Sequence, residues 1–353
     1  MKRLKSIVLA ACAVFVAGLL LLQTPASAQS SASLSITPKK NYTIEPGRTI
    51  NDTITIRNLD AERSLDLSLR IVDFTFMDDG GAPQLFLAED APQTTWSLKP
   101  FMTTAQSVSI APRSSETVPI SVSIPEGQGA GSFYSAILYS AGAPEGGNVG
   151  LSASGVTLVF TTIPGIVDEK LTLEQFGAYN TGTNGEEPGY KLLATSEPTV
   201  IAYTLKNEGN VTEAPVGSIK LKYMFGKEYN ITNVNPNESL ALIGQTRTFT
   251  SCIKLQSEDI DFNGTRAEAT QCASPGLWPG LYTADIDLFY GQNGNRTQEI
   301  ISSAWFWYLP WWFIIAFFVV LLIIAYFVWR IVRAVRQRLY GSHRRRSPQR
   351  RRR

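Results

Sequence analysis

The chain has 353 residues, of which 44% are hydrophobic and 18% charged, and its formal net charge is +2 at pH 7. The near balance hides a segregation of charge: residues 29–310 hold all 30 acidic residues and 18 basic ones, whereas residues 330–353 hold eleven arginines and no acidic residue. An acidic body disfavours binding to DNA, teichoic acid or another polyanion, because phosphate recognition depends on Lys and Arg.

The first 28 residues have the pattern of a secretory signal peptide. Three of the first five residues are basic, an apolar stretch follows over residues 7–22, and Ala26-Ser27-Ala28 supplies the small residues that a signal peptidase reads. We therefore predict a signal peptide over residues 1–28. Two alternatives stay open: residues 9–12, which end in Cys12, resemble a lipoprotein cleavage box, and the segment could remain uncleaved as a membrane span.

The middle of the chain alternates apolar and polar residues with the period of a β-strand. The alternation is clearest over Leu65–Ile71, Val118–Ile124 and Ile219–Tyr223, and turn signals rich in Gly, Pro and Asn separate such runs. One apolar and one polar face is what the sheets of a sandwich require. The sequence predicts an all-β fold of two tandem Ig-like antiparallel β-sandwich domains, over residues 29–164 and 165–304.

A short internal similarity favours two related domains. Gly131–Ala136 resembles Gly280–Ala284, and each segment leads from a turn rich in Pro and Gly into an apolar strand. Tyr134 and Tyr282 then occupy the position at which Ig-like domains place a tyrosine whose hydroxyl bonds back to nearby backbone. The alternative is that both are ordinary aromatic strand residues, because β-propensity favours Tyr there in any case.

Two cysteines, Cys252 and Cys272, lie in the predicted exported region. An even number of cysteines in an exported chain predicts a disulfide, and two buried free thiols are the alternative.

Asp259, Asp261 and Asn263 lie between these cysteines and match the first half of a calcium-binding loop. The twelfth position of the pattern is Thr270 instead of the usual bidentate Glu, so calcium is a weak hypothesis beside a solvated acidic loop. We predict no cofactor and no other metal site.

The only histidine is His343, near the C-terminus. This excludes Ser-His-Asp and Cys-His catalysis, and any metal held by histidine, from residues 29–304. We therefore predict a protein that is not an enzyme, and no residue is a candidate catalytic group.

The stretch Trp311–Trp329 consists of 19 apolar or aromatic residues. A helix of this length spans about 28 Å, close to the thickness of a bilayer core. Trp311 and Trp312 border it on one side and Trp329 on the other, and the first residues of the basic tail, Arg330 and Arg333, follow. We predict a transmembrane helix with an aromatic flank over residues 305–329 and a cytoplasmic Arg-rich tail over residues 330–353. The chain is then a single-pass protein of the cell membrane, with its β-sandwiches outside.

The order of these elements resembles a known family. LSITPKKNYTIEPGRTINDTITIRNLD, VPISVSIPEGQGAGSFYSAILY, YTLKNEGNVTEAPVGSIKLKYMFGKE and GLYTADIDLFYG, followed by one span and a basic tail, are similar to the WxL-interacting cell-surface proteins of bacteria. The resemblance implies a first domain that binds peptidoglycan, a second that contacts host molecules, and association with a WxL-type wall protein. The segment between Cys252 and Cys272 departs from the family pattern.

These observations lead to one expectation about function. We expect a non-enzymatic bacterial surface protein whose Ig-like domains bind peptidoglycan, a wall-associated protein, or both. The alternative is an adhesin or an assembly subunit that contacts a host or partner cell surface. Nucleic acid is not an expected partner of the acidic body.

Overall fold

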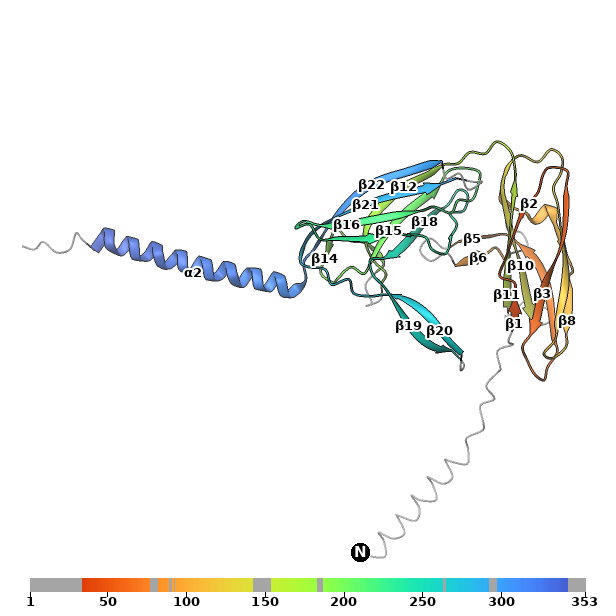
Figure 1. Ribbon diagram of the computed structural model, residues 1–353, viewed down its shortest axis with the longest axis horizontal. Helices are drawn as coiled ribbons and strands as arrows, with labels where there is room; N and C mark the ends of the chain where they lie inside the picture. Colours follow the sequence, from red (N-terminus) through yellow and green to blue (C-terminus); the bar gives the residue numbers. More distant parts are fainter. Residues whose placement is uncertain are drawn as a thin grey trace, which may run out of the picture. The chain divides into compact units, whose positions relative to one another are not determined.

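The structure is a computed structural model that describes residues 34–76, 82–88, 91, 93–141, 154–182, 187–262, 265–291 and 297–341 (Figure 1). The predicted signal peptide and residues 342–353 of the predicted tail lie outside these ranges.

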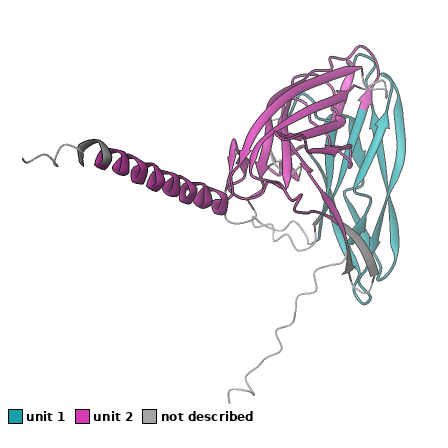
Figure 2. Cartoon of the chain, turned by 60° about the vertical axis from the view of Figure 1, so that its left-hand side comes forward, with its two compact units in different colours: residues 1–73, 92–128, 134–161 teal, residues 74–91, 129–133, 162–353 magenta. Residues whose placement is uncertain are grey.

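Contacts divide the chain into two compact units, which Figure 2 colours separately. Unit 1 comprises residues 1–73, 92–128 and 134–161, and unit 2 comprises residues 74–91, 129–133 and 162–353. The domain boundary at residues 164 and 165 stays a prediction.

The first sandwich consists of two sheets with strand orders β1-β3-β9-β7 and β2-β11-β10-β4-β8. Val118, Ile120 and Val122 are buried while Pro119 and Ser123 are exposed, as the alternating sequence predicts. The strands of the first sheet are β1 (Leu34–Ile36), β3 (Thr49–Asn58), β9 (Ser115–Ser123) and β7 (Met102–Thr104). Those of the second are β2 (Lys39–Thr43), β11 (Ser154–Ile163), β10 (Gly131–Ala141), β4 (Leu65–Val72) and β8 (Ser107–Ile110). A short 3₁₀ helix, η1 (Lys99–Phe101), precedes β7.

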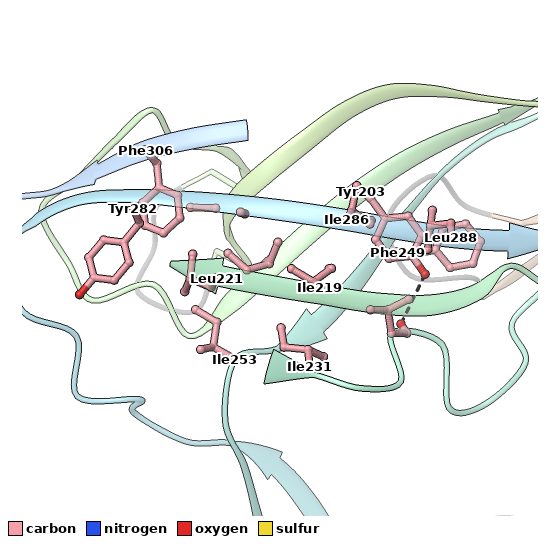
Figure 3. Close-up of a cluster of buried hydrophobic side chains, with 14 of the residues drawn as sticks. Tyr203, Ile219, Leu221, Ile231, Phe249, Ile253, Tyr282, Ile286, Leu288 and Phe306 are labelled. Atoms are coloured by element: carbon pink, nitrogen blue, oxygen red, sulfur yellow. Dashed lines mark hydrogen bonds between the residues drawn. The ribbon is translucent and has the colours of Figure 1, made fainter. Parts of the chain in front are cut away.

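The second sandwich has sheets ordered β13-β12-β15-β18 and β14-β22-β21-β16-β17. Its core lies between them, where Tyr203 stacks on Phe249 at 5.2 Å between ring centroids and Tyr282 on Phe306 at 5.4 Å (Figure 3). The strands of the first sheet are β12 (Leu171–Asn180), β13 (Gly189–Tyr190), β15 (Val200–Asn207) and β18 (Thr246–Cys252). Those of the second are β14 (Leu193–Ala194), β16 (Val216–Tyr223), β17 (Glu228–Ile231), β21 (Gly280–Tyr290) and β22 (Gln298–Tyr308).

Two hairpins stand apart from these four sheets. One is β5 (Phe74–Phe76) with β6 (Pro83–Leu85), which the contacts assign to unit 2. The other is β19 (Leu255–Phe262) with β20 (Thr265–Cys272), inserted between β18 and β21.

The two sandwiches share the order of eight strands and differ in one edge strand each, β7 beside β9 in the first and β13 beside β12 in the second. In one sheet, β1-β3-β9 of the first sandwich corresponds to β12-β15-β18 of the second. In the five-stranded partner sheet, β2-β11-β10-β4-β8 corresponds to β14-β22-β21-β16-β17. The similar segments that start at Gly131 and Gly280 begin β10 and β21, which hold equivalent positions. The Tyr282 hydroxyl donates to the Trp278 carbonyl at 2.9 Å, which is the bond back to nearby backbone that the sequence suggests.

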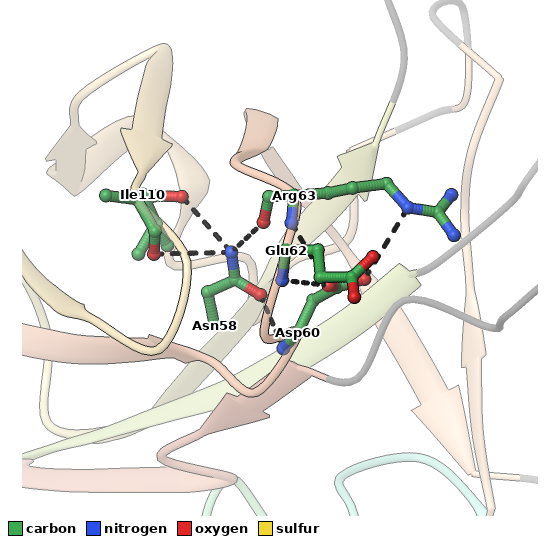
Figure 4. Close-up of polar contacts among 6 residues, drawn as sticks. Asn58, Asp60, Glu62, Arg63 and Ile110 are labelled. Atoms are coloured by element: carbon green, nitrogen blue, oxygen red, sulfur yellow. Dashed lines mark hydrogen bonds and ion pairs between the residues drawn. The ribbon is translucent and has the colours of Figure 1, made fainter.

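A buried asparagine ends the equivalent strands β3 and β15. The side-chain amide of Asn58 donates to the carbonyls of Arg63 at 2.8 Å and Ile110 at 3.2 Å, and its oxygen accepts from the Asp60 N–H at 2.9 Å (Figure 4). Asn207 donates in the same way to two carbonyls, and its oxygen accepts from an N–H two residues on. Each asparagine side chain therefore supplies hydrogen-bond partners for backbone groups of the turn that follows its strand.

The helix α2 (Trp311–Gly341) follows β22 after only two residues. The most apolar 18-residue window within its stretch Trp311–Gln337 has a mean hydropathy of 2.8, and no part of that window is buried. This is long and apolar enough to cross a membrane by length and composition. The predicted all-β fold with Ig-like sandwiches and one C-terminal apolar helix is confirmed.

Candidate functional site

A polar pocket lies in the second sandwich, where the chain changes from one sheet to the other. Strand β12 ends at Asn180, and β13 pairs with it through only two residues. The chain then moves across to form β14, which pairs in parallel with the end of β22 through Leu193 and Ala194. Strands β13 and β14 are each only two residues long, so they do not close the edge between the two sheets. A cavity of about 570 Å³ remains there.

Hydroxyl, amide and charged groups dominate the pocket lining. The lining comprises Ala178, Tyr179, Asn180, Thr181, Glu187, Lys191, Leu193, Ala194, Thr195, Ser196, Glu197, Pro198 and Thr199. The Tyr179 ring packs edge-to-face on Tyr190 at 5.2 Å between centroids, which fixes one aromatic wall. Such a lining suits a ligand rich in hydroxyl and amide groups, because buried polar groups need hydrogen-bond partners.

Glu197 holds the loop at one side of the pocket. Its carboxylate accepts hydrogen bonds from the Ser274 hydroxyl and from the Leu277 N–H, so it ties the loop before β15 to the segment that precedes β21. Burial raises the pKa of the nearby Tyr308 hydroxyl, and the negative charge of Glu197 adds to this rise. The role of Glu197 is therefore to position this loop.

Tyr190 lies behind the aromatic wall. Its hydroxyl shares a hydrogen bond of 2.6 Å with the Thr204 hydroxyl, and burial raises the pKa of Tyr190 to about 12. The phenol is therefore neutral at physiological pH. Pairing between β12 and β13 keeps Tyr190 directly across from Tyr179.

The residues singled out from the sequence lie elsewhere. Cys252 and Cys272 form a disulfide with 5.1 Å between their Cα atoms, so these two are brought together. Asp259 and Asp261 belong to strand β19, whereas Asn263 lies outside the described residues, and calcium binding stays a hypothesis. Among the described residues, no group of three or more His, Cys, Asp or Glu side chains is arranged to hold a metal ion.

The membrane-anchor residues all belong to α2. Trp311 and Trp312 form its first turn, and Trp329, Arg330 and Arg333 lie further along it, with Trp311, Trp312 and Trp329 more than half exposed. The Arg333 guanidinium lies over the Trp329 ring at 5.3 Å from its centroid, within the reach of about 6 Å for a cation–π contact. The aromatic residues Trp305 and Trp307, predicted as part of the flank, are strand residues of β22.

Sequence reasoning did not find the polar pocket. Its most distinctive sequence signal is the run Thr195-Ser-Glu-Pro-Thr199, in which three hydroxyl residues and a carboxylate fall between two apolar segments. Such a run reads as an ordinary loop, because nothing local shows that β13 and β14 will be too short to cover it.

No family model matches the sequence, and no curated protein matches it. Solved structures with some likeness include the Escherichia coli chaperone DraB (12% identity, covering 79% of this chain and 98% of that chain, TM-score 0.32). The SafB chaperone structure with the Salmonella enterica SafA pilin gives 8% identity, 80% and 98% coverage and a TM-score of 0.34. The Pseudomonas aeruginosa CupB2 chaperone gives 7% identity, 77% and 100% coverage and a TM-score of 0.32. Scores this low carry no conclusion about what this chain binds.

Proposed function

We propose that the chain is a membrane-anchored, non-enzymatic binding protein of a bacterial surface. The observation that carries the proposal is α2, whose apolar side chains are exposed on all sides and which begins two residues after the last strand of the second sandwich. The stretch Trp311–Trp329 is apolar or aromatic throughout and its most apolar window is not buried by the described part of the chain, so it needs an apolar surrounding, and a bilayer supplies one.

The distribution of charge supports an outward-facing β-rich body. Eleven arginines and no acidic residue occupy residues 330–353, and the bias of Lys and Arg near a span favours the cytoplasmic side. The sandwiches then face the outside, in agreement with the signal-peptide pattern of residues 1–28.

The ligand we propose is peptidoglycan, a wall-associated protein, or both. The polar pocket supports this choice, because its amide and hydroxyl groups match the amides and hydroxyls of a glycan that carries peptide stems. Lys191 places a cation in the lining, where it complements a stem carboxylate. The resemblance to the WxL-interacting proteins points to the same class of ligand.

Retention on purified cell wall tests the proposal. Full-length protein in detergent is mixed with peptidoglycan that has been stripped of protein, and with wall that keeps its proteins. We expect retention on at least one of them, and the comparison tells which of the two ligands is bound. Retention on foreign cells but on neither wall preparation would instead favour the adhesin alternative.

A matched pair of variants connects retention to the pocket. Ser196→Trp fills the pocket from an exposed lining position, and Ser218→Trp makes the same change at an exposed position of β16, outside the lining. We expect the first variant to lose retention and the second to keep it. Equal retention by both would place the binding surface elsewhere on the chain.

A further inference from the structure

An exposed apolar rim surrounds the end of the second sandwich from which α2 leaves. We call this set the interface rim, and it comprises Leu192, Leu193, Met224, Phe225, Trp278 and Trp307. Phe225 is 77% exposed, Leu192 67% and Trp278 66%, so these side chains pack little against the sandwich. Large apolar side chains gathered at one end of a domain mark a surface that binds something apolar.

Strand register brings the interface rim together from four separate segments. Trp307 of β22 is opposite Leu281 of β21 on one side and Leu193 of β14 on the other. The Met224 N–H donates to the Leu281 carbonyl at 3.1 Å, which adds the turn after β16 to the same row. In Figure 1, β14 lies at the end of the second sandwich where α2 begins.

Few residues between this end of the sandwich and α2 lack backbone hydrogen bonds to one or the other. The Leu309 N–H donates to the Ala194 carbonyl at 2.9 Å, so the backbone is bonded to the sandwich up to Leu309. The Phe313 and Ile314 N–H groups donate to the Pro310 carbonyl, so helical bonding starts at the next residue. Trp311 is four positions after Trp307, which is at most about 14 Å of fully extended chain.

A membrane crossed by α2 is therefore within reach of the interface rim. The headgroup layer adds about 5 to 8 Å on each side of the hydrocarbon core, and Trp311 and Trp312 are the first residues of the apolar span. Trp, Phe, Leu and Met are the side chains that enter this layer, with Trp preferring its polar boundary. Lys191 precedes Leu192 in the sequence and Lys227 follows Phe225 by two residues, so each adds a basic residue near the rim that favours anionic headgroups.

We propose that the interface rim inserts into the outer headgroup layer of the membrane that α2 crosses, so that the second sandwich is docked on lipid. This inference rests on the proposed function, because it needs α2 to span the bilayer. Docking holds the polar pocket at the membrane surface, since Leu193 belongs both to the rim and to the pocket lining. The pocket then meets the part of the wall nearest the membrane.

An environment-sensitive fluorophore on single cysteines tests the docking. Full-length protein in a Cys12→Ser background, with the Cys252–Cys272 disulfide intact, is labelled at Phe225→Cys and reconstituted into phosphatidylcholine and phosphatidylglycerol vesicles. We expect blue-shifted emission and quenching by lipids that carry a spin label near the headgroup.

Two further labels serve as controls. Ile166→Cys is the matched control, because Ile166 is 99% exposed and precedes Leu171, whose N–H bonds the Tyr290 hydroxyl at the opposite end of β21. This label should stay in water and escape quenching. A label at Ile323→Cys, in the middle of α2, reports whether the helix lies in lipid at all.

The three labels separate the possible failures. Quenching at position 323 with an aqueous label at position 225 would overturn the docking but leave the proposed function intact. An aqueous label at position 323 would overturn both. A label at position 225 that is blue-shifted but not quenched by lipid would show burial against protein, and equal quenching at position 166 would show contact that is not specific to the rim; either result overturns the docking.

Discussion

The buried asparagines Asn58 and Asn207 are single residues on which a whole turn depends. Asn58 is 1% exposed and Asn207 is completely buried, and each joins carbonyls and an N–H of two chain segments. Alanine at either position removes the side-chain donor of these carbonyls and the side-chain acceptor of the N–H. We expect Asn58→Ala and Asn207→Ala each to lower the free energy of unfolding by about 2 kcal/mol, measured by urea denaturation.

A surface asparagine gives the comparison for these two variants. Asn51 is exposed near the start of β3, so Asn51→Ala should change the free energy of unfolding by less than about 0.5 kcal/mol. If all three variants lost the same free energy of unfolding, the hydrogen bonds of the buried Asn58 and Asn207 side chains would not be the cause.

Glu213 is a buried carboxylate whose charge opposes folding. It is 2% exposed, and its carboxylate accepts a hydrogen bond from the Gly291 N–H at 3.1 Å. Burial raises the pKa of Glu213 to about 7, a rise to which the charge of Glu169 contributes and which the Gly291 hydrogen bond limits. Since the unfolded carboxyl has a pKa near 4.3, the folded state loses stability relative to the unfolded state as the pH rises from about 4 to 7.

The variant Glu213→Gln removes this titration. The raised pKa corresponds to a loss of about 3 kcal/mol between pH 4 and pH 8, so the variant gains about this much on the wild type over that interval. Urea denaturation at the two pH values measures it, with Glu116→Gln on the exposed face of β9 as the control that follows the wild type. A constant difference between Glu213→Gln and the wild type at both pH values would contradict the assignment.

At the scale of elements, the inserted hairpin β19–β20 is held by one covalent bond. The disulfide joins Cys252 at the end of β18 to Cys272 at the end of β20, 20 residues apart. We expect the double variant Cys252→Ser with Cys272→Ser to lower the free energy of unfolding by about 3 kcal/mol, because the unfolded chain regains the freedom of the closed loop. Urea denaturation without reductant measures it, and Cys12→Ser should leave the stability unchanged.

Elements were predictable where local pattern and burial agree. The alternation of Val118, Ile120 and Val122 predicts β9 because one face of that strand is buried along its length. The short strands β13 and β14 have no such pattern, since two paired residues each leave no period to detect. The pocket between them depends on pairing with β12 and β22, which is a property of the sheets and not of the local sequence.

The same limit applies to the residues before the span. Aromatic side chains at Trp305 and Trp307 are typical of a membrane flank, and the sequence shows no break before Trp311 other than Pro310. Pairing with Thr283 and Leu281 instead makes them part of β22. Long-range strand pairing therefore decides where the sandwich ends and where α2 begins.

At the scale of the whole molecule, two sandwiches that share the order of eight strands and an equivalent buried asparagine point to one repeated architecture. The sequence shows only a trace of it, at Gly131 and Gly280, because most core positions need only suitable size and apolarity. Both sandwiches have asparagine at this position, Asn58 and Asn207, because hydrogen bonds in a buried site require a particular polar group.

The attachment of the whole chain to a membrane is the property on which the proposed function depends. Apolar residues fill the central part of α2, and an acidic residue there has to enter the hydrocarbon core. One charged residue at the centre of a span costs about 3 kcal/mol on the insertion scale, so Val320→Asp together with Ile324→Asp costs about 6 kcal/mol. We expect this double variant to move from the membrane fraction to the soluble fraction after alkaline carbonate extraction.

The variant Arg333→Asp is the matched control for position along the helix. It also introduces an acidic residue into α2, but beyond Trp329, where the side chain reaches the headgroup layer and ten arginines remain in the tail. This control should stay in the membrane fraction with the wild type. Loss of all three proteins from the membrane fraction would show that α2 does not anchor the chain. Retention of the double aspartate variant would instead show attachment through another surface, and the interface rim is the surface that the second sandwich offers for it.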